Sequence, residues 1–493
     1  MNLKHILWYL GVFLILNGIL LLIPIPIAIL YNEPILPFLV GGASSWLFGA
    51  ILMRFPKSEL EFGDTMLLVA LGLIILSLFA SLPLLFETER FDMDSIINCY
   101  FDSISGYTTA GFTTMSNEML NPNSEKYKYS IIFLRTLREW IGGLGIIVIF
   151  LSTLARGGIS TVYLYRMEHG DRKILPSVEH TARFILRMYI FYTFVGTVVL
   201  WLLGTSLFYA ITGTMSMLAT GGFIINDLGF HVNKESELVL LLIMTIGAIP
   251  FTLGYVLLSG NIKRFLCNLE IRTAFVVSLF SVFIFTVLLM INGNDVITSI
   301  YKSTVGVISA MSTSGYSSAN LEDLGDAGKF LLILLMIIGA GAGSTGGGLK
   351  WIRLGVLVKA VRWIIRKSSL PESAVLPLKI DGRIFDDQDL RFISLFFFIY
   401  IALIAIGSLI FLIYNPEYEL VDALLISSSI QSNVGINLGI NITDQPIIVK
   451  LIFIFQMIAG RIEIFPVLAL IGYIIGEFKR EIKYVENELE HRR

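Results

Sequence analysis

One pattern occurs four times in this sequence: Thr109-Ala110-Gly111-Phe112, Thr220-Gly221-Gly222-Phe223, Thr313-Ser314-Gly315-Tyr316 and Asn433-Val434-Gly435-Ile436. Each strip of small and hydroxyl-bearing residues ends in a glycine and a bulky residue, between two long apolar stretches. A shorter, moderately apolar, helix-like segment precedes each strip. Backbone carbonyls of such strips can replace the water shell of a potassium ion. The pattern predicts a selectivity filter whose four parts all come from one polypeptide.

The composition places the chain in a membrane. Of its 493 residues, 55% are hydrophobic and only 15% are charged, with a mean hydropathy of +0.78. Soluble proteins carry about a quarter charged residues. The first apolar run, 6–30, is too long for the core of a signal peptide and contains Pro24 and Pro26. We therefore expect it to remain as a helix.

Two classes of apolar segment define the expected fold. A bilayer core needs about 20 apolar residues per helix. Ten stretches meet that length: 6–30, 36–54, 64–86, 130–155, 183–204, 237–260, 272–292, 329–367, 391–414 and 447–476. Four segments, 95–108, 206–219, 296–312 and 420–432, are too short and too polar to span. The prediction is an all-α membrane protein with ten transmembrane helices and four re-entrant pore helix–filter loops.

The order of these segments predicts internal repeats. After a two-helix N-terminal extension, 1–58, the unit helix–pore helix–helix (M1-P-M2) occurs four times around a central pore. The predicted repeats are 59–170, 171–265, 266–368 and 369–493. The third has a broken second helix, and the fourth includes a cytoplasmic tail. All four have the same orientation, because each contains two spans.

The charges predict the orientation of the chain. Most of the 36 lysines and arginines lie on the side that also carries both termini, which is therefore cytoplasmic. The outer mouth is partly acidic, with Glu87, Glu89, Asp92, Asp94, Asp295, Glu417, Glu419 and Asp422. These acids could attract cations, or could simply be tolerated outside, and Asp94 and Asp295 could be helix N-caps. The cytoplasmic stretch 350–391 and the tail 479–493 could bind membrane lipid or a soluble partner, but ordinary positive-inside charge is the simpler interpretation.

The chemistry of the strips favours a monovalent cation. A pore helix whose C-terminal end points at the pore presents about half a negative charge to a desolvated ion. The strips contain no acid, which argues against Ca²⁺ and Mg²⁺. Glycine permits the backbone conformations that aim carbonyls inward. The candidate ion-binding residues are Thr109, Ala110, Gly111, Thr220, Gly221, Gly222, Thr313, Ser314, Gly315, Asn433, Val434 and Gly435.

A glycine-rich stretch interrupts the eighth span, from Gly339 to Lys350. Gly341, Gly343 and Gly346 satisfy the G-x-G-x-x-G dinucleotide pattern, but a membrane helix precedes them where that motif needs a strand. The alternative is a helix broken at membrane depth below the third strip. It could be a mobile gate, which we favour, or a rigid packing turn. The candidate gate residues are Gly341, Gly343, Ser344, Thr345, Gly346, Gly347, Gly348 and Arg461.

Arg461 lies with Glu463 inside the last span. A mid-membrane arginine costs about 2.5–3.5 kcal/mol on insertion scales and normally faces a cavity or a partner. It could pair with Glu463 or with carbonyls of the glycine-rich loop, and its charge could form a barrier below the filter. These interpretations are compatible.

Together the four strips, the stretch Gly339–Lys350 and the segment Gly460-Arg461-Ile462-Glu463-Ile464-Phe465 resemble the Trk, Ktr and HKT potassium transporter superfamily, most closely its Trk-type members. The resemblance implies a homodimer with one pore per protomer and a cytoplasmic ring of TrkA-like nucleotide-binding subunits. It also implies that Gly341–Gly348 is the gate and Arg461 its partner. Ala110 and Ile436 depart from the usual family pattern, whereas glycine in all four strips favours K⁺.

The sequence thus predicts gated K⁺ uptake across the cell membrane, with K⁺ as the transported ion, no cofactor and no nucleic-acid partner. A symporter coupled to Na⁺ or H⁺ is the alternative. A membrane enzyme that uses the glycine-rich loop for a nucleotide is disfavoured, because the strand, the acid and a catalytic cluster are missing.

Overall fold

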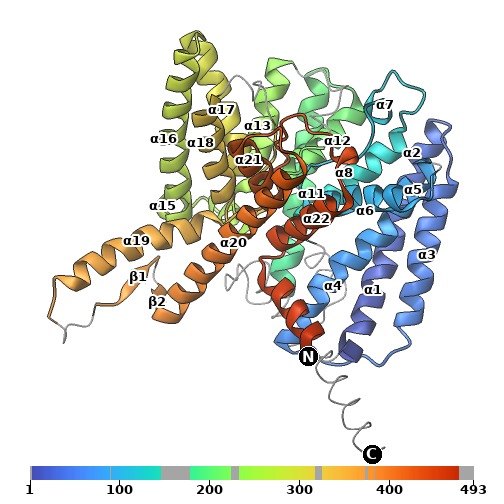
Figure 1. Cartoon of the computed structure of the whole chain (residues 1–493), viewed down its shortest axis with the longest axis horizontal. Coiled ribbons are helices and arrows are strands. Elements are labelled where there is room, and N and C mark those ends of the chain that lie inside the picture. Colours follow the sequence, from blue (N-terminus) through green and yellow to red (C-terminus); the bar gives the residue numbers. More distant parts are fainter. Residues whose placement is uncertain are drawn as a thin grey trace, which may run out of the picture.

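The computed structural model describes residues 3–88, 90–145, 178–223, 233–316, 325–371, 376–381 and 383–476. Helices dominate this part of the chain, as predicted (Figure 1). The exception is a small antiparallel hairpin of β1 (Leu378–Ile380) and β2 (Arg383–Phe385), beside the projecting helix α19 (Trp351–Ser368). The predicted tail 479–493 and the stretch 146–155 of the fourth span lie outside the described residues.

The N-terminal extension contains α1 (Leu3–Leu22), α2 (Ile25–Leu30) and α3 (Leu36–Leu52). Pro24 separates α1 from α2. Glycines allow α1 and α3 to pack backbone to backbone, since a Cβ on Gly11 would lie 2.7 Å from the carbonyl oxygen of Gly49. This pair lies at one edge of the molecule (Figure 1).

Polar contacts fasten the extension to the rest of the protein. The Glu33 carboxylate accepts hydrogen bonds from the backbone N–H groups of Tyr129, at 2.6 Å, and Ser130, at 2.9 Å. It thereby satisfies free donors at the N-terminus of α8 (Tyr129–Leu144). Tyr31 stacks on Tyr129 at 3.9 Å between ring centroids. These contacts fix the position of the extension against α8.

Four short helices match the predicted non-spanning segments: α6 (Met93–Thr108), α12 (Leu207–Leu218), α17 (Val296–Ser312) and α21 (Leu420–Gln431). The preceding long helices are α4 (Phe62–Ala80) with α5 (Leu82–Thr88), α11 (Val178–Leu202), α16 (Leu269–Ile291) and α20 (Asp387–Tyr414). Those that follow are α8, α13 (Lys234–Ala248) with α14 (Phe251–Leu258), α18 (Gly325–Ile338) with α19, and α22 (Ile447–Arg461). The connections contain α7 (Asn117–Leu120), α15 (Ile262–Cys267) and the 3₁₀ turn η2 (Ile442–Asp444).

The short helices and the helices that follow them pack in a closed cycle. Helix α8 contacts α6 and α12, α13 contacts α12 and α17, α18 contacts α17 and α21, and α22 contacts α21 and α6. Each following helix therefore bridges its own short helix and the next one. The C-terminal halves of the short helices are buried at the centre of this cycle.

Five spans in the described residues are long and apolar enough to cross a membrane: Ile6–Leu30, Gly63–Thr88, Ala182–Leu202, Leu269–Ile291 and Asp387–Tyr414. Two bent helix pairs raise the number to seven if each counts as one span. The chain is thus an integral, multi-pass membrane protein.

Two predicted continuous spans, 237–260 and 447–476, are wrong in this respect: both are bent. The chain turns by 108° between α13 and α14, because Pro250 lacks the N–H group that would continue the helix. It turns by 119° between α22 and the helical segment Phe465–Gly476. There Glu463 and Ile464 adopt left-handed backbone angles, with φ of 64° and 59°. The predicted interruption of 329–367 is present, between Ile338 and Trp351.

Candidate functional site

Each of the four strips begins with a residue in the left-handed conformation. The φ angles are 58° at Thr109, 55° at Thr220, 61° at Thr313 and 53° at Asn433. This conformation is an outlier for a β-branched residue such as threonine. It occurs here directly after the last turn of all four short helices. The same unusual turn therefore redirects the chain at the end of each short helix.

The glycine of each strip also has a positive φ: 73° at Gly111, 79° at Gly222, 69° at Gly315 and 90° at Gly435. Residues with a Cβ atom rarely adopt a positive φ, whereas glycine adopts it readily. Two left-handed positions separated by one residue change the direction of successive carbonyls. The glycines are therefore required by the backbone path of the strips.

The strips approach one another closely. A Cβ on Gly111 would lie 2.4 Å from the Gly221 carbonyl oxygen and 3.2 Å from the Cα of Gly435. A Cβ on Gly315 would lie 2.0 Å from the Val434 carbonyl oxygen. Strips from sequence positions more than 300 residues apart thus meet, with backbone carbonyls beside the neighbouring glycines. All twelve candidate ion-binding residues belong to these four strips.

The glycine-rich loop between α18 and α19 packs against the short-helix ends. The backbone N–H of Gly347 donates to Thr313 Oγ1 at 2.9 Å, and a Cβ on Gly347 would lie 2.2 Å from the Ser432 carbonyl oxygen. Thr345 Oγ1 donates to the carbonyl oxygens of Leu218 and Gly247, each at 2.9 Å. The loop therefore lies directly beside three of the four strips.

The same loop also closes the break between α13 and α14. The N–H of Gly341 donates to the Ala248 carbonyl at 3.0 Å, and the Gly343 carbonyl accepts from the N–H of Phe251 at 3.1 Å. Within the loop, Ser344 Oγ donates a hydrogen bond to the Gly341 carbonyl at 2.6 Å. Backbone groups released by one broken helix are thus satisfied by another, as membrane depth requires.

Arg461, the last residue of α22, holds the loop from the other side. Its guanidinium donates to the Thr345 carbonyl at 2.6 Å and to the carbonyls of Gly142 and Gly143, the latter at 3.1 Å. Of the two predicted pairings, the contact with loop carbonyls is present. Glu463 forms an ion pair with Arg353 at 2.5 Å.

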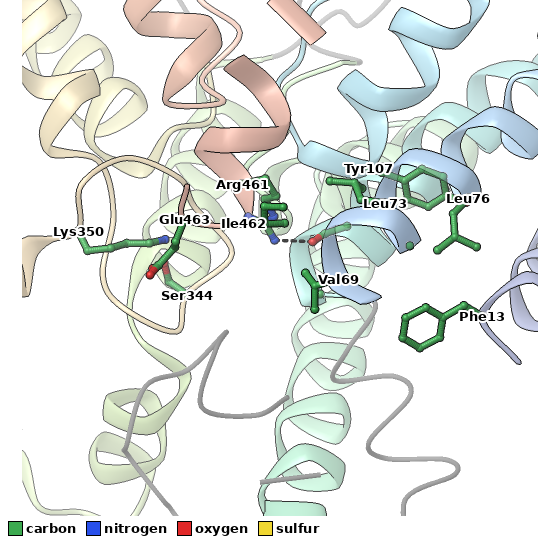
Figure 2. A pocket seen from close by; sticks show the side chains of 13 residues that line it. Phe13, Val69, Leu73, Leu76, Tyr107, Ser344, Lys350, Arg461, Ile462 and Glu463 are labelled. Carbon is green, nitrogen blue, oxygen red and sulfur yellow. Dashed lines mark hydrogen bonds between the residues drawn. The ribbon is translucent and has the colours of Figure 1, made fainter. Parts of the chain in front are cut away.

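A cavity of about 90 Å³ lies beside Arg461 (Figure 2). Lys350, Glu463 and Ser344 bound it on the side of the glycine-rich loop, where the Lys350 ammonium donates to the Gly346 carbonyl. The opposite wall is apolar and comes from the extension, α4 and α6; it comprises Phe13, Val69, Leu73, Leu76 and the ring of Tyr107. Two of the predicted gate residues, Ser344 and Arg461, therefore line a partly polar space.

Buried charges behind the first two strips were missed by the sequence analysis. Asp102 on α6 forms ion pairs with Arg135, at 3.3 Å, and Arg138, at 3.4 Å, and accepts from Thr113 at 2.9 Å. Next to them, Glu139 on α8 contacts the second strip. The signal was available, because charges inside an apolar span mark functional or paired positions.

Four of the eight predicted outer acids, Asp92, Asp94, Asp295 and Asp422, have structural roles, and Glu89 lies outside the described residues. Asp92 and Asp295 are the N-caps of α6 and α17, accepting from the backbone N–H groups of Ser95 and of Ile297 and Thr298. The suggested cap at Asp94 is therefore wrong: Asp94 pairs with Lys450 at 2.8 Å. Three of these acids, Glu87, Asp92 and Asp94, line an outer cavity of about 970 Å³, together with Glu118.

This combination of membrane spans, converging acid-free strips and a loop beside them defines a membrane cation transport protein and not an enzyme. Its G-x-G-x-x-G stretch lies between two helices. The family model of TrkH, described as a cation transport protein, matches residues 38–474. The chain belongs to this family.

Several relatives share almost the full length. An uncharacterized cation transporter of Methanocaldococcus jannaschii, MJ1485, is 34% identical over 98% of both chains. The Trk system potassium uptake protein TrkH of Salmonella typhimurium is 28% identical, covering 95% of this chain and 98% of its own. The crystal structure of the potassium transporter TrkH from Vibrio parahaemolyticus superposes with a TM-score of 0.81 at 24% identity, over 95% of this chain and 98% of that one. The last comparison shows that the fold is shared.

Proposed function

We propose that this protein takes up K⁺ across the cell membrane through a K⁺-selective filter formed by the four strips. The observation that carries the proposal is the convergence of four strips, each with a left-handed residue followed two positions later by a left-handed glycine. Carbonyl oxygens and helix C-terminal ends suit a monovalent cation that has lost its water. The names of the Trk system relatives agree with potassium as the ion.

The architecture that we propose for this filter is four M1-P-M2 repeats around a central pore, within a fold of ten transmembrane helices. The closed cycle of contacts from α8 to α22 supports this arrangement. We assign the repeats to 59–170, 171–265, 266–368 and 369–493, after the extension 1–58. In this assignment the second helices of the last three repeats are broken next to the filter.

The glycine-rich loop Gly341–Gly348 and Arg461 form the proposed gate. Support comes from the hydrogen bonds of Thr345 and Gly347 beside the strips and from the guanidinium of Arg461 on the Thr345 carbonyl. A fixed positive charge at this place raises the energy of a cation leaving the filter. Opening would require the loop to move away from the short-helix ends.

The assembly we propose is a homodimer with one pore per protomer, controlled by cytoplasmic TrkA-like nucleotide-binding subunits. The relatives are named as members of a Trk system, which supports a role as one component of several. Membrane lipid would cover the exposed apolar faces of helices such as α16 and α20.

Flux measurements on purified protein in liposomes test the proposal. Uptake of K⁺, Rb⁺ and Na⁺ is compared, with and without an opposing pH or Na⁺ gradient. The expected result is uptake of K⁺ and Rb⁺ well above Na⁺ and no dependence on either gradient. Equal uptake of all three ions would refute the filter, and a requirement for a gradient would favour the coupled symporter.

A further inference from the structure

Each of the four helices that follow a strip-bearing loop carries a charged side chain that reaches the next unit in the cycle. They are Glu139 on α8, Glu237 on α13, Lys329 on α18 and Lys450 on α22. Each crosses the boundary that its helix forms with the following short helix. The two carboxylates and the two lysines differ in what they contact.

Glu139 supports the second strip from behind. The side chain is 0% exposed, and its two oxygens accept from Ser216 Oγ at 2.6 Å and from the backbone N–H of Phe223 at 3.1 Å. Phe223 is the residue after the strip glycine Gly222. A Cβ on Gly221 would lie 2.4 Å from the carboxyl carbon of Glu139. The carboxylate is therefore in direct contact with the backbone of the strip.

Glu237 binds the third strip through the side chain of the equivalent residue, whereas Glu139 binds the backbone of the second strip. Its carboxylate accepts from the hydroxyl of Tyr316 at 2.7 Å and from the hydroxyl of Tyr301 on α17. Tyr316 is the residue after the strip glycine Gly315. The same position of two successive strips is thus bound by a carboxylate from the preceding unit.

The two lysines act at the outer ends of the short helices instead. Lys329 pairs with Asp422 in the first turn of α21 at 2.6 Å. Lys450 pairs with Asp94 in the first turn of α6 at 2.8 Å, and also donates to the Thr443 carbonyl at 2.7 Å. These pairs join neighbouring units without contacting the residue after a strip glycine.

We propose that Glu139 and Glu237 are positioning residues for ion discrimination, each fixing the residue that follows the strip glycine of the next unit. The inference rests on the proposed filter. A buried carboxylate is expensive unless hydrogen bonds satisfy it, and here the donors are the strip and the short helix that carries it. The strip carbonyls determine the size of the ion-binding cavity. Loss of either carboxylate therefore lets the carbonyls adopt a wider range of positions, some of which fit Na⁺.

Glu237 offers the cleanest test, since three variants separate its contacts. Glu237→Ala removes the acceptor, Glu237→Gln keeps one acceptor oxygen, and Tyr316→Phe removes only the strip hydroxyl. The readout is the ratio of K⁺ to Na⁺ uptake in liposomes, normalised to inserted protein. Lys329→Ala is the matched control, because it breaks a contact between units away from the strip glycines. For Glu139, the mild variant is Ser216→Ala.

We expect Glu237→Ala to lower the ratio on the order of tenfold, the size associated with a hydrogen bond to a charged group. Glu237→Gln should restore most of it. Tyr316→Phe should lower the uptake ratio less than Glu237→Ala. In the double variant Glu237→Ala and Tyr316→Phe, the two effects should not be fully additive. Lys329→Ala should leave the ratio unchanged.

Three results would overturn the inference: an unchanged ratio in inserted Glu237→Ala, an equal fall in Lys329→Ala, or full additivity with Tyr316→Phe. If Glu237→Ala fails to insert, an unchanged ratio in Tyr316→Phe and Ser216→Ala overturns it. A wild-type protein without preference for K⁺ would instead refute the proposed filter itself.

Discussion

The guanidinium of Arg461 donates to the carbonyl oxygen of Thr345 at 2.6 Å, which joins the end of α22 to the glycine-rich loop. Thr345 in turn contacts Leu218 at the end of α12 and Gly247 in α13. Two interrupted helices and one short-helix end therefore share a single polar junction. Side-chain donors of Arg461 and Thr345 and backbone carbonyl acceptors thus link the end of α22 to the end of α12, two residues before the second strip.

The strip glycines yield a prediction about selectivity. Gly111→Ser places a side chain where a Cβ would lie 2.4 Å from the Gly221 carbonyl oxygen, in a left-handed conformation that costs a side chain about 1–2 kcal/mol. We expect the K⁺ to Na⁺ uptake ratio to fall on the order of tenfold, with the protein still inserted. An unchanged ratio in a well-expressed variant would argue against this strip as part of the filter.

Glycine at an exposed turn provides the control. Gly293 also has a positive φ, of 87°, but a Cβ there would meet no atom within 4 Å. Gly293→Ser therefore carries a similar backbone strain without disturbing the strips. The uptake ratio should stay at the wild-type value, and a fall equal to that of Gly111→Ser would show that backbone strain alone is responsible.

The exposed N-caps yield a prediction about pH. Hydrogen bonds from the Ser95 backbone lower the pKa of Asp92, and those from the Thr298 backbone lower the pKa of Asp295. A lowered folded-state pKa contributes stability above the unfolded pKa of about 3.9, and this contribution is lost as pH falls through the folded value. Thermal stability in detergent should therefore decrease from pH 5 to pH 3.

Replacing both caps tests the assignment. In the double variant Asp92→Ala and Asp295→Ala, the melting temperature at pH 6 should be lower and its decrease towards pH 3 shallower than in wild type. The exposed Asp326, in the first turn of α18, supplies the matched Asp326→Ala control. If the double variant kept the full acid sensitivity, these caps would not be its source.

The sequence was sufficient for the four short helices, because each is a short, more polar segment between long apolar runs and ends at a strip. It was insufficient for the breaks at Pro250 and after Arg461, because apolar composition continues through both. The released N–H of Phe251 finds its acceptor at Gly343, about 90 residues later, and no local pattern reveals such a partner.

The site divides in the same way. The strip residues were predicted from a repeated local pattern, whereas their supports come from other units. Glu139 and Glu237 have no repeat signature, since one lies eleven residues and the other four residues into its helix. Only the fold brings them to Phe223 and Tyr316. The pairing of Glu463 with Arg353 was missed for the same reason.

The proposed partner gives a prediction about nucleotides. The sequence between the apolar spans has no segment long enough to fold into a nucleotide-binding domain. We expect K⁺ flux through this chain alone in liposomes to be insensitive to added ATP, ADP or NADH. Flux should respond only when a separate soluble subunit is added. Direct regulation of the purified chain by any of these nucleotides would contradict the proposal.

The junction at Thr345 gives the final prediction, about the gate. A unit positive charge raises the energy of a cation that passes at a separation of about 8 Å by about 2 kcal/mol, at an effective dielectric constant of about 20. Arg461→Ala should therefore increase ⁸⁶Rb⁺ uptake by roughly ten- to thirtyfold. Deleting Ala342–Ser344 should act in the same direction, because it removes the Gly343 carbonyl that holds Phe251 and shortens the loop beside the strips.

If both changes act on one constriction, the double variant should exceed the larger single effect only slightly, as expected for residues in contact. Arg353→Ala is the control, since it removes a nearby guanidinium that pairs with Glu463 and stacks on the Phe396 ring. Uptake in all variants is normalised to inserted protein. Fully additive effects, or loss of flux with intact protein, would mean that the loop is a rigid support and that the gate lies elsewhere.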